Sequence, residues 1–209
     1  MQRALRMVGN KGIWARHIAL VLALSFSGTG GASADTASLA KAEAAGRGIG
    51  IAVSAPLPAK AVVRDTAGKP VSLAQMKGRK GALIVFFRSA AWCPYCKAQL
   101  KSLTDVAQAA RSRGIAMAAI SYDAPAVLDK FAKAETLGFP LYSDGGSRLI
   151  DTLKLRDPRY DSSSYANGVP YPTILLVGPD GRVKAKVVET DYKIRPSNAD
   201  VVALLDRLK

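Results

Sequence analysis

The chain has 209 residues, of which 49% are hydrophobic and 22% are charged. That is enough apolar material for one ordinary globular domain, and it excludes a collagen-like, coiled-coil or wholly disordered chain. Lysine and arginine outnumber aspartate and glutamate by 30 to 16, and the chain has two cysteines and one histidine.

Residues 1–34 carry the features of an export signal in the usual order. Basic residues come first, residues 18–26 form a short apolar run, and Ala32-Ser33-Ala34 offers a cleavage pattern of small residues. No twin arginine is present, so we expect the general export route. Cleavage after Ala34 would give a periplasmic or secreted protein without stable membrane insertion. The alternative is an uncleaved N-terminal membrane anchor, although the apolar run is short for a bilayer span.

Loss of this segment limits the chemistry of the mature protein. It removes His17 and four basic residues, which leaves a net charge of about +10. Without histidine, Ser-His-Asp and Cys-His catalysis are excluded, as are zinc or copper sites with histidine ligands. A c-type haem attachment is excluded because Lys97 stands where that motif needs histidine. We therefore expect no metal and no organic cofactor.

Residues 35–57 are rich in Ala, Gly and Ser and end in a proline-containing stretch. This composition predicts a flexible lead-in with room for a short helix over 37–45. The globular domain is expected over 58–209.

In that domain, apolar runs alternate with helical patterns, which indicates an α/β fold. In chain order we expect a strand over 61–64, a strand over 70–73, a short helix over 74–77, a buried strand over 82–87, a helix over 94–112, a strand over 115–121, a helix over 126–137, a strand over 139–142, a helix over 147–155, strands over 173–177 and 183–189, and a helix over 198–208. Lys184 and Lys186 suit a charged sheet edge.

The stretch 156–171 is polar and longer than most connections in compact domains. It is either a lid or binding loop, or a plain surface insertion. Basic residues are scattered along the chain without a stacking motif, so we expect a solvated basic surface and no nucleic-acid partner.

The two cysteines stand where the strand over 82–87 passes into a helix. Pro94 suits the first helical position, which puts Cys93 at the helix N-terminus, where free backbone donors and the helix dipole lower the pKa of its thiol. Cys96 lies one turn further on the same face, close enough for a disulfide. We expect Cys93 to attack and Cys96 to resolve the resulting intermediate, provided that solvent reaches the sulfur of Cys93.

Two alternatives to thiol exchange exist for this cysteine pair. A structural disulfide is common in exported proteins, but such a short loop gives little entropic stabilisation. The second alternative is a metal site, but zinc requires four ligands, and the mature chain has only these two cysteines and no histidine.

The segment from Trp92 to Lys97, which reads Trp-Cys-Pro-Tyr-Cys-Lys, resembles the active site of the thioredoxin superfamily. The segment Tyr171-Pro172-Thr173 is similar to its cis-proline segment. The extended front end and long insertion look most like the redoxin branch, the alkyl hydroperoxide reductase and thiol-specific antioxidant (AhpC/TSA) family. The resemblance implies a thioredoxin-like three-layer α/β/α sandwich with a central mixed sheet, Cys93 as nucleophile, Cys96 as resolver, and a cis Pro172. It also implies that the backbone of Tyr171 offers hydrogen bonds to a partner strand.

The sequence departs from this family in two places. Typical peroxiredoxins resemble Pro-x-x-x-Thr-x-x-Cys, whereas Phe86 and Ala90 stand seven and three positions before Cys93. Thioredoxins have a buried aspartate in the strand beneath the cysteines, and this strand ends in Phe86 and Phe87. Lys97 or a chain of water molecules is therefore the candidate proton acceptor for Cys96.

Four side chains are candidate supports for the cysteines. Arg88 either stabilises a thiolate or a peroxide oxygen, or points to solvent. Trp92 is expected to shield the cysteines with one face and meet partners with the other. Tyr95 is expected to be exposed, and Tyr171 to contact a partner.

We predict an exported thiol-disulfide oxidoreductase that works through Cys93 and Cys96, with dithiol and disulfide proteins as electron donor and client. One alternative is a peroxiredoxin-like thiol peroxidase that reduces hydroperoxides at Cys93. The other is a non-catalytic binding module in which the two cysteines form a structural disulfide.

Overall fold

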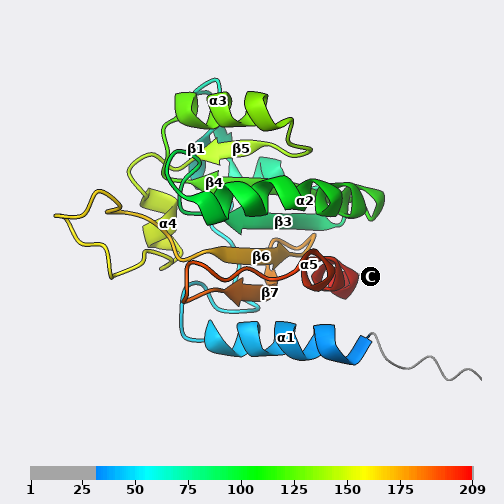
Figure 1. Ribbon diagram of the computed structural model, residues 1–209. Helices are drawn as coiled ribbons and strands as arrows, with labels where there is room; N and C mark the ends of the chain where they lie inside the picture. The colour runs from blue at the N-terminus through cyan, green and yellow to red at the C-terminus, as the bar shows by residue number, and fades with distance from the viewer. Residues whose placement is uncertain (1–31, 209) are drawn as a thin grey trace, which may run out of the picture. The chain divides into compact units, whose positions relative to one another are not determined.

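A computed structural model of the chain describes residues 32–208, which fold around one mixed sheet (Figure 1). Its strands are β1 (Val62–Arg64), β2 (Pro70–Ser72), β3 (Gly81–Phe86), β4 (Ile115–Ser121), β5 (Leu141–Ser143), β6 (Thr173–Val177) and β7 (Val183–Val188). Their order in the sheet is β2-β1-β5-β4-β3-β6-β7. Strand β4 pairs in parallel with β3 and β5, and the other pairs are antiparallel.

Helices cover both faces of this sheet. They are α1 (Ala32–Ala45), the 3₁₀ turn η1 (Leu73–Met76), α2 (Pro94–Ser112), α3 (Pro125–Glu135), α4 (Arg148–Thr152), α5 (Asn198–Leu205) and the 3₁₀ turn η2 (Asp206–Leu208). One core cluster joins α1, α2, α3 and α5 to the sheet, and a second cluster joins η1 and α4 to its other face. This arrangement is the expected three-layer α/β/α sandwich.

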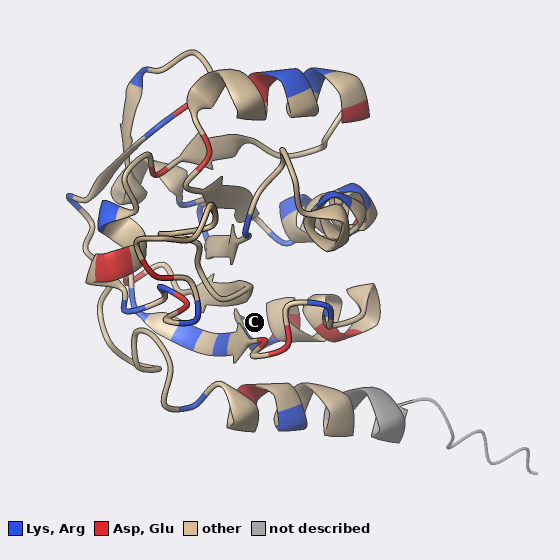
Figure 2. Ribbon diagram, turned by 60° about the vertical axis from the view of Figure 1, so that its left-hand side comes forward, with Lys and Arg blue, Asp and Glu red and all other residues tan. Residues whose placement is uncertain are grey.

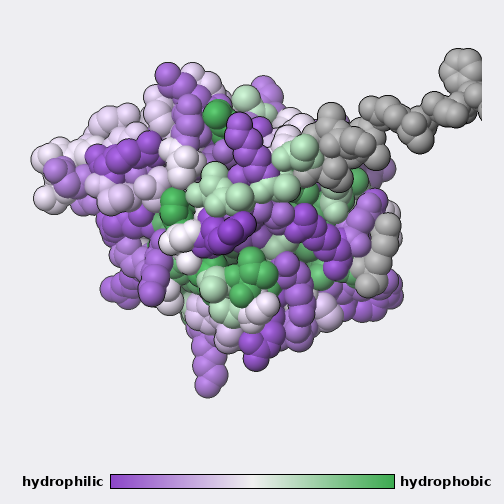
Figure 3. All heavy atoms as spheres, turned by 90° about the horizontal axis from the view of Figure 1, so that it is seen from below, coloured by the Kyte–Doolittle hydropathy of each residue, from purple (hydrophilic) through white to green (hydrophobic). Residues whose placement is uncertain are grey.

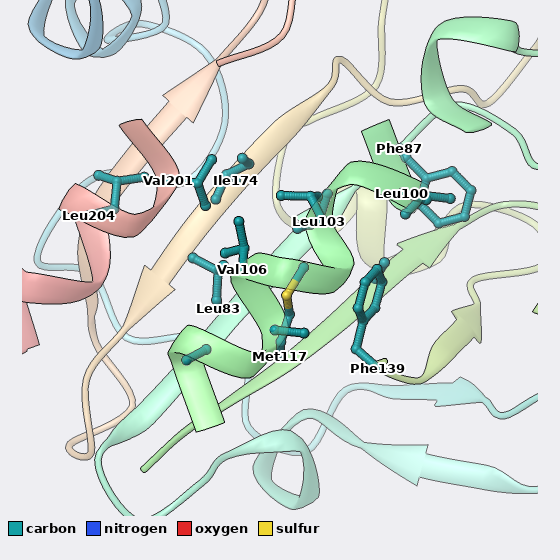
Figure 4. Close-up of a cluster of buried hydrophobic side chains, with 14 of the residues drawn as sticks. Leu83, Phe87, Leu100, Leu103, Val106, Met117, Phe139, Ile174, Val201 and Leu204 are labelled. Atoms are coloured by element: carbon teal, nitrogen blue, oxygen red, sulfur yellow. The ribbon is translucent and has the colours of Figure 1, made fainter. Parts of the chain in front are cut away.

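Strand β3 shows why its sequence is continuously apolar. Leu83 and Val85 belong to the cluster under α2, whereas Ile84 and Phe86 belong to the cluster on the opposite face. Successive side chains of a strand point to opposite faces, so a central strand covered on both faces needs apolar residues throughout. Figure 4 shows the α2 side of this core, where Leu83 lies near Val106 of α2.

The lead-in over 35–57 differs from the flexible segment that its composition predicts. Helix α1 packs against β7 and α5, and Leu39 is buried in the main core cluster. The side chain of Lys186 on β7 is also buried, and its Nζ donates hydrogen bonds to the backbone carbonyls of Arg47 and Ile49 after α1. The charged edge expected on β7 is therefore present at Lys184, which is exposed, and wrong for Lys186.

Seen from the α1 side, the surface mixes apolar and polar side chains (Figure 3). Basic and acidic residues are also interspersed over helices and loops (Figure 2). Most of the ion pairs they form are partly or fully exposed, and pairs of this kind contribute little to stability.

The expected order of strands and helices is confirmed, with small differences at element ends. The helix expected over 147–155 is limited to the short α4, and the last helix ends at Leu205 before the turn η2. Among residues 32–208, no helix is both long and apolar enough to cross a membrane. Almost all of the expected export signal lies outside the described residues and stays a prediction.

Candidate active site

Asp123 fixes the loop that carries the cysteines from β3 to α2. Its carboxylate accepts hydrogen bonds from the Ala90 amide at 2.6 Å and from the hydroxyls of Ser89 and Ser121 at 2.8 and 3.1 Å. Burial raises the pKa of Asp123, and these hydrogen bonds act in the opposite direction.

Sequence reasoning missed this aspartate, although a signal exists for it. Strands β3 and β4 are parallel neighbours, so polar residues that follow the two strands meet at one edge of the sheet. Asp123 comes two residues after β4 ends, and the cysteine loop follows β3.

Cys93 and Cys96 form a disulfide at the N-terminus of α2. Pro94 is the first residue of the helix and Cys93 is its N-cap. The Sγ of Cys93 accepts a hydrogen bond from the Cys96 amide at 3.2 Å. In the reduced protein the same amide and the helix dipole favour a thiolate at Cys93. The structure thus places Cys93 at the helix start that the sequence predicts, and its role as the attacking residue stays a prediction.

Solvent access to the disulfide is lower than the sequence-based mechanism requires. Cys93 is 1% exposed and Cys96 is fully buried. Trp92 is half-buried and packs against the same core cluster. A partner therefore reaches Cys93 only after neighbouring side chains move.

Arg195 contacts the disulfide from the segment between β7 and α5. Its Nη2 lies 3.4 Å from the Sγ of Cys96, and its Nε donates to Gln99 Oε1 on α2 at 2.7 Å. Burial lowers the pKa of Arg195 to about 10, while Glu189 acts in the opposite direction. No local sequence pattern marks Arg195, because the contact depends on how this segment returns to α2.

Arg88 does not point to solvent, which excludes one of its two expected placements. The residue is 1% exposed, and its guanidinium lies over the rings of Trp92, Tyr160 and Tyr192 at 5.1, 4.6 and 4.3 Å from their centroids. Its Nε has no hydrogen-bond partner. Arg88 is thus a buried cation held by three aromatic rings beside the cysteine loop.

Further aromatic contacts extend this cage to the surface. Trp92 donates from Nε1 to the Tyr122 hydroxyl at 3.1 Å, and its ring meets Tyr165 edge to face at 5.3 Å. Tyr95 meets Tyr192 in the same way at 5.9 Å. Tyr95 and Tyr165 are exposed, at 40% and 78%. We call Trp92, Tyr95, Tyr160, Tyr165 and Tyr192 the aromatic rim.

The 156–171 loop supplies Tyr160 and Tyr165 to this rim. At its base the Asp157 amide donates to the Val169 carbonyl at 2.9 Å, and the buried Asp157 carboxylate pairs with Arg159 at 2.7 Å. A hydrogen bond from the Ser147 hydroxyl to the Gly168 carbonyl also holds it. The loop is therefore in contact with the cysteine loop, which favours a binding role over a plain insertion.

The Tyr171-Pro172-Thr173 segment enters β6 beside the cysteine strand, since Thr173 pairs with Phe86. The Tyr171 amide donates to the Leu155 carbonyl at 2.8 Å, and the Tyr171 carbonyl accepts from the Thr173 hydroxyl at 3.0 Å. The Tyr171 N–H is therefore already used within the chain, whereas its carbonyl oxygen keeps a second lone pair, so a hydrogen bond from a partner strand to that carbonyl stays a prediction. Pro172 and the Thr173 side chain are buried at this edge.

Lys97 follows Cys96 directly, and its expected role as proton acceptor for that thiol stays a prediction. Its backbone amide donates a hydrogen bond to the Cys93 carbonyl at 3.1 Å, and its ammonium group lowers the pKa of Asp123. The cation that touches Cys96 is Arg195. Among the side chains that the structure describes, those of residues 37–208, no cluster of three or more His, Cys, Asp or Glu residues is arranged to hold a metal ion.

Comparison with known proteins places this site in a family. Residues 53–186 match the AhpC/TSA family. The chain belongs to that family. Among its relatives are the thiol-disulfide oxidoreductases ResA of Bacillus cereus, 29% identical over 63% of this chain, and of Bacillus subtilis, 28% identical over 62%. These matches span 68% and 64% of the two ResA chains.

Peroxiredoxins are similar as well. Peroxiredoxin Bcp of Escherichia coli K12 is 26% identical over 57% of this AhpC/TSA chain and 75% of its own. Among solved structures, BcpB of Mycobacterium tuberculosis has a TM-score of 0.62 at 20% identity, and covers 76% of this chain and 99% of its own. Reduced Prx3 of Vibrio vulnificus has a TM-score of 0.65 at 16% identity, and the match covers 75% of this chain and 99% of the Prx3 chain. These structures establish the thioredoxin-like fold, and the family with its curated relatives marks the chain as an oxidoreductase.

Proposed function

We propose that this AhpC/TSA protein is a thiol-disulfide oxidoreductase in which Cys93 attacks and Cys96 resolves. The observation that carries the proposal is the disulfide at the start of α2, where the Cys96 amide donates to the Sγ of Cys93. Reduced Cys93 attacks a partner's disulfide and releases one partner sulfur as a thiolate. Cys96 then attacks Cys93, closes the internal disulfide and releases the second partner sulfur.

The serine hydroxyl beside Cys93 supports disulfide exchange over peroxide reduction, because it is not free to orient a hydroperoxide. Ala90 stands where the family's threonine would orient a hydroperoxide. The nearest replacement, the Ser89 hydroxyl, donates to Asp123 and accepts from the amides of Ala91 and Trp92. Its hydrogen-bonding capacity is used, so it does not replace the missing threonine.

A thiol peroxidase is the second candidate, and the burial of Cys93 favours it. A hydroperoxide is small enough to approach a sulfur that is 1% exposed with less movement of the aromatic rim than a protein needs. The relative Bcp is a peroxiredoxin. In this reading a hydroperoxide oxidises Cys93 to a sulfenic acid, and Cys96 resolves it with loss of water.

Two rates separate these functions. We expect reduced protein to reduce the disulfides of insulin, and to react with hydrogen peroxide no faster than a free thiolate does. Cys93→Ser abolishes the insulin reaction, whereas Cys96→Ser retains the first attack and accumulates a mixed disulfide detectable by mass spectrometry. A peroxide reaction far faster than that of a free thiolate, with inert behaviour toward insulin, would establish the peroxidase instead.

The proposal includes export from the cytoplasm. It is supported by the order of basic, apolar and small residues in 1–34, and by the persistence of disulfides in oxidising compartments. N-terminal sequencing of the protein from its native host should give a chain that starts at Asp35. An intact chain recovered in the membrane fraction would show an anchor instead.

A further inference from the structure

Arg195 holds a fixed position against the resolving sulfur. Besides its contacts with Cys96 and Gln99, its Nη1 donates to the backbone carbonyls of Tyr192 and Ile194, both at 2.6 Å. The guanidinium is thus tied to its own segment and to α2. It approaches Cys96 from the β7–α5 side, whereas Lys97 acts on Asp123.

The charge of Arg195 is only partly compensated around the disulfide. Among the side chains of residues 37–208, no carboxylate forms an ion pair with it within 4.0 Å, although Glu189 and Asp191 act on it from a greater distance. Arg88, the other buried cation of the site, acts against its positive charge. A disulfide sulfur is neutral, so the guanidinium gains a full counter-charge only when Cys96 becomes a thiolate.

Arg195 also connects the buried sulfur to the surface. Together with Glu189, Ile194 and Leu39, it lines a cavity of about 370 Å³ between α1 and the segment that follows β7. One side of its guanidinium contacts Cys96, while the cavity gives the residue access to water.

We propose that Arg195 is a further catalytic residue, which stabilises the anionic sulfur of Cys96 while that sulfur closes the disulfide. This inference rests on the proposed exchange function and adds a group for its second step. In that step the Cys96 thiolate forms a bond to the Sγ of Cys93. The bond between Cys93 and the partner's sulfur breaks, and its electron pair leaves with the partner as a thiolate.

The inference supplies what the thioredoxin-like site lacks. A thiol as buried as Cys96 ordinarily has a raised pKa, and the strand beneath it ends in phenylalanine rather than aspartate. A cation 3.4 Å away acts in the opposite direction. Arg195 therefore takes the place of a proton acceptor, because its positive charge favours the thiolate form of Cys96.

The test measures the acidity of Cys96 in the full domain. In a Cys93→Ser background Cys96 is the only thiol, because the chain has two cysteines, and thiolate absorbance in the ultraviolet reports its ionisation. Arg195→Gln should raise the pKa of Cys96 by about one to three, so at a pH below the pKa of the parent thiol the thiolate fraction falls about ten- to thousand-fold. Arg195→Lys should keep part of the effect. The matched control is Arg113→Gln, which removes a guanidinium paired with Asp206 and should leave the pKa of Cys96 unchanged.

A second variant serves as the test if Arg195→Gln does not fold, and circular dichroism shows whether it folds. Gln99→Met removes the acceptor that aims the guanidinium and should raise the pKa of Cys96 by a smaller amount. An unchanged pKa in the folded Arg195→Gln protein, or in Gln99→Met where Arg195→Gln does not fold, overturns the inference.

A kinetic readout in the two-cysteine protein links the charge to the second step. Arg195→Gln should accumulate the mixed disulfide with insulin, while the first attack by Cys93 keeps its rate. Equal resolution rates in the variant and the parent protein would contradict the assignment. The thiol titration needs no partner, so failure of insulin reduction with an intact titration effect would refute the exchange function and leave the effect of Arg195 on Cys96 standing.

Discussion

The cage around Arg88 shows at the scale of one residue why the type of cation matters. A guanidinium is planar and weakly hydrated, so it stacks on aromatic rings, whereas an ammonium is compact and strongly hydrated. Three rings surround the guanidinium of Arg88, and its Nε has no hydrogen-bond partner. Stacking is therefore the main interaction that the cage offers to this buried charge.

Arg88→Lys should consequently destabilise the protein. We expect a loss of about 1–3 kcal/mol in the free energy of unfolding, since each cation–π contact contributes roughly 0.5–2 kcal/mol and the lysine leaves part of the cage unfilled. Urea denaturation measures the change. Arg111→Lys, at an exposed arginine of α2, is the matched control. Equal stability of the Arg88→Lys and parent proteins would show that the rings do not select a guanidinium.

At the scale of elements, the 156–171 loop and helix α1 each add a part that the core sheet does not require. The loop adds Tyr160 and Tyr165 to the aromatic rim, and α1 covers β7 and buries Leu39. The first is expected to affect partners and the second to affect stability.

Tyr165→Ala should separate partner binding from folding. Tyr165 is 78% exposed, so its loss should change the free energy of unfolding by no more than about 0.5 kcal/mol. Exposed aromatic residues often dominate protein interfaces, so we expect the rate of insulin reduction to fall at least about five-fold. The rate with a small disulfide such as oxidised glutathione should stay the same. An equal loss with both substrates would mean that Tyr165 acts on the cysteines themselves.

Leu39→Ala tests whether α1 belongs to the folded domain. Leu39 is 3% exposed in the main core cluster, and truncation of a buried leucine costs about 2–5 kcal/mol. We expect a loss near the lower end, because α1 packs at the edge of the sheet. Thermal and urea unfolding measure it, with the exposed Lys41→Ala as control. No destabilisation would support the flexible lead-in that the composition predicts.

At the scale of the whole molecule, local patterns determined what could be predicted. The apolar run of β3 and Pro94 at the start of α2 each identify their element within a few residues, because strand burial and helix initiation depend on neighbouring positions. Arg195 and Tyr160 meet the cysteine site only through tertiary folding, and no periodicity connects them to it, whereas Asp123 could have been found from its place directly after β4. Helix α1 was missed as a core element because Leu39 is one leucine in an alanine-rich segment.

The partly buried carboxyl groups predict how stability depends on pH. Burial raises the pKa of Glu189 above its ordinary value of 4.5, with Arg195 acting in the opposite direction and Asp191 and Asp200 adding to the rise. The folded state therefore binds the Glu189 proton more tightly than the unfolded state does. Its contribution to stability is complete below that ordinary value, and is lost as the pH rises through the folded-state pKa.

Glu189→Gln removes this loss, because the amide has a similar shape and does not ionise. We expect the variant to be at least as stable as the parent at neutral pH, with the difference between them growing as the pH rises from about 4.5 and then levelling off. Urea denaturation across a pH series measures the difference, and Asp129→Asn on the exposed face of α3 controls for a general loss of negative charge. A parent protein that gains stability over the variant with rising pH would show that Arg195 outweighs burial at Glu189, and that the cation has a counter-charge before Cys96 is reduced.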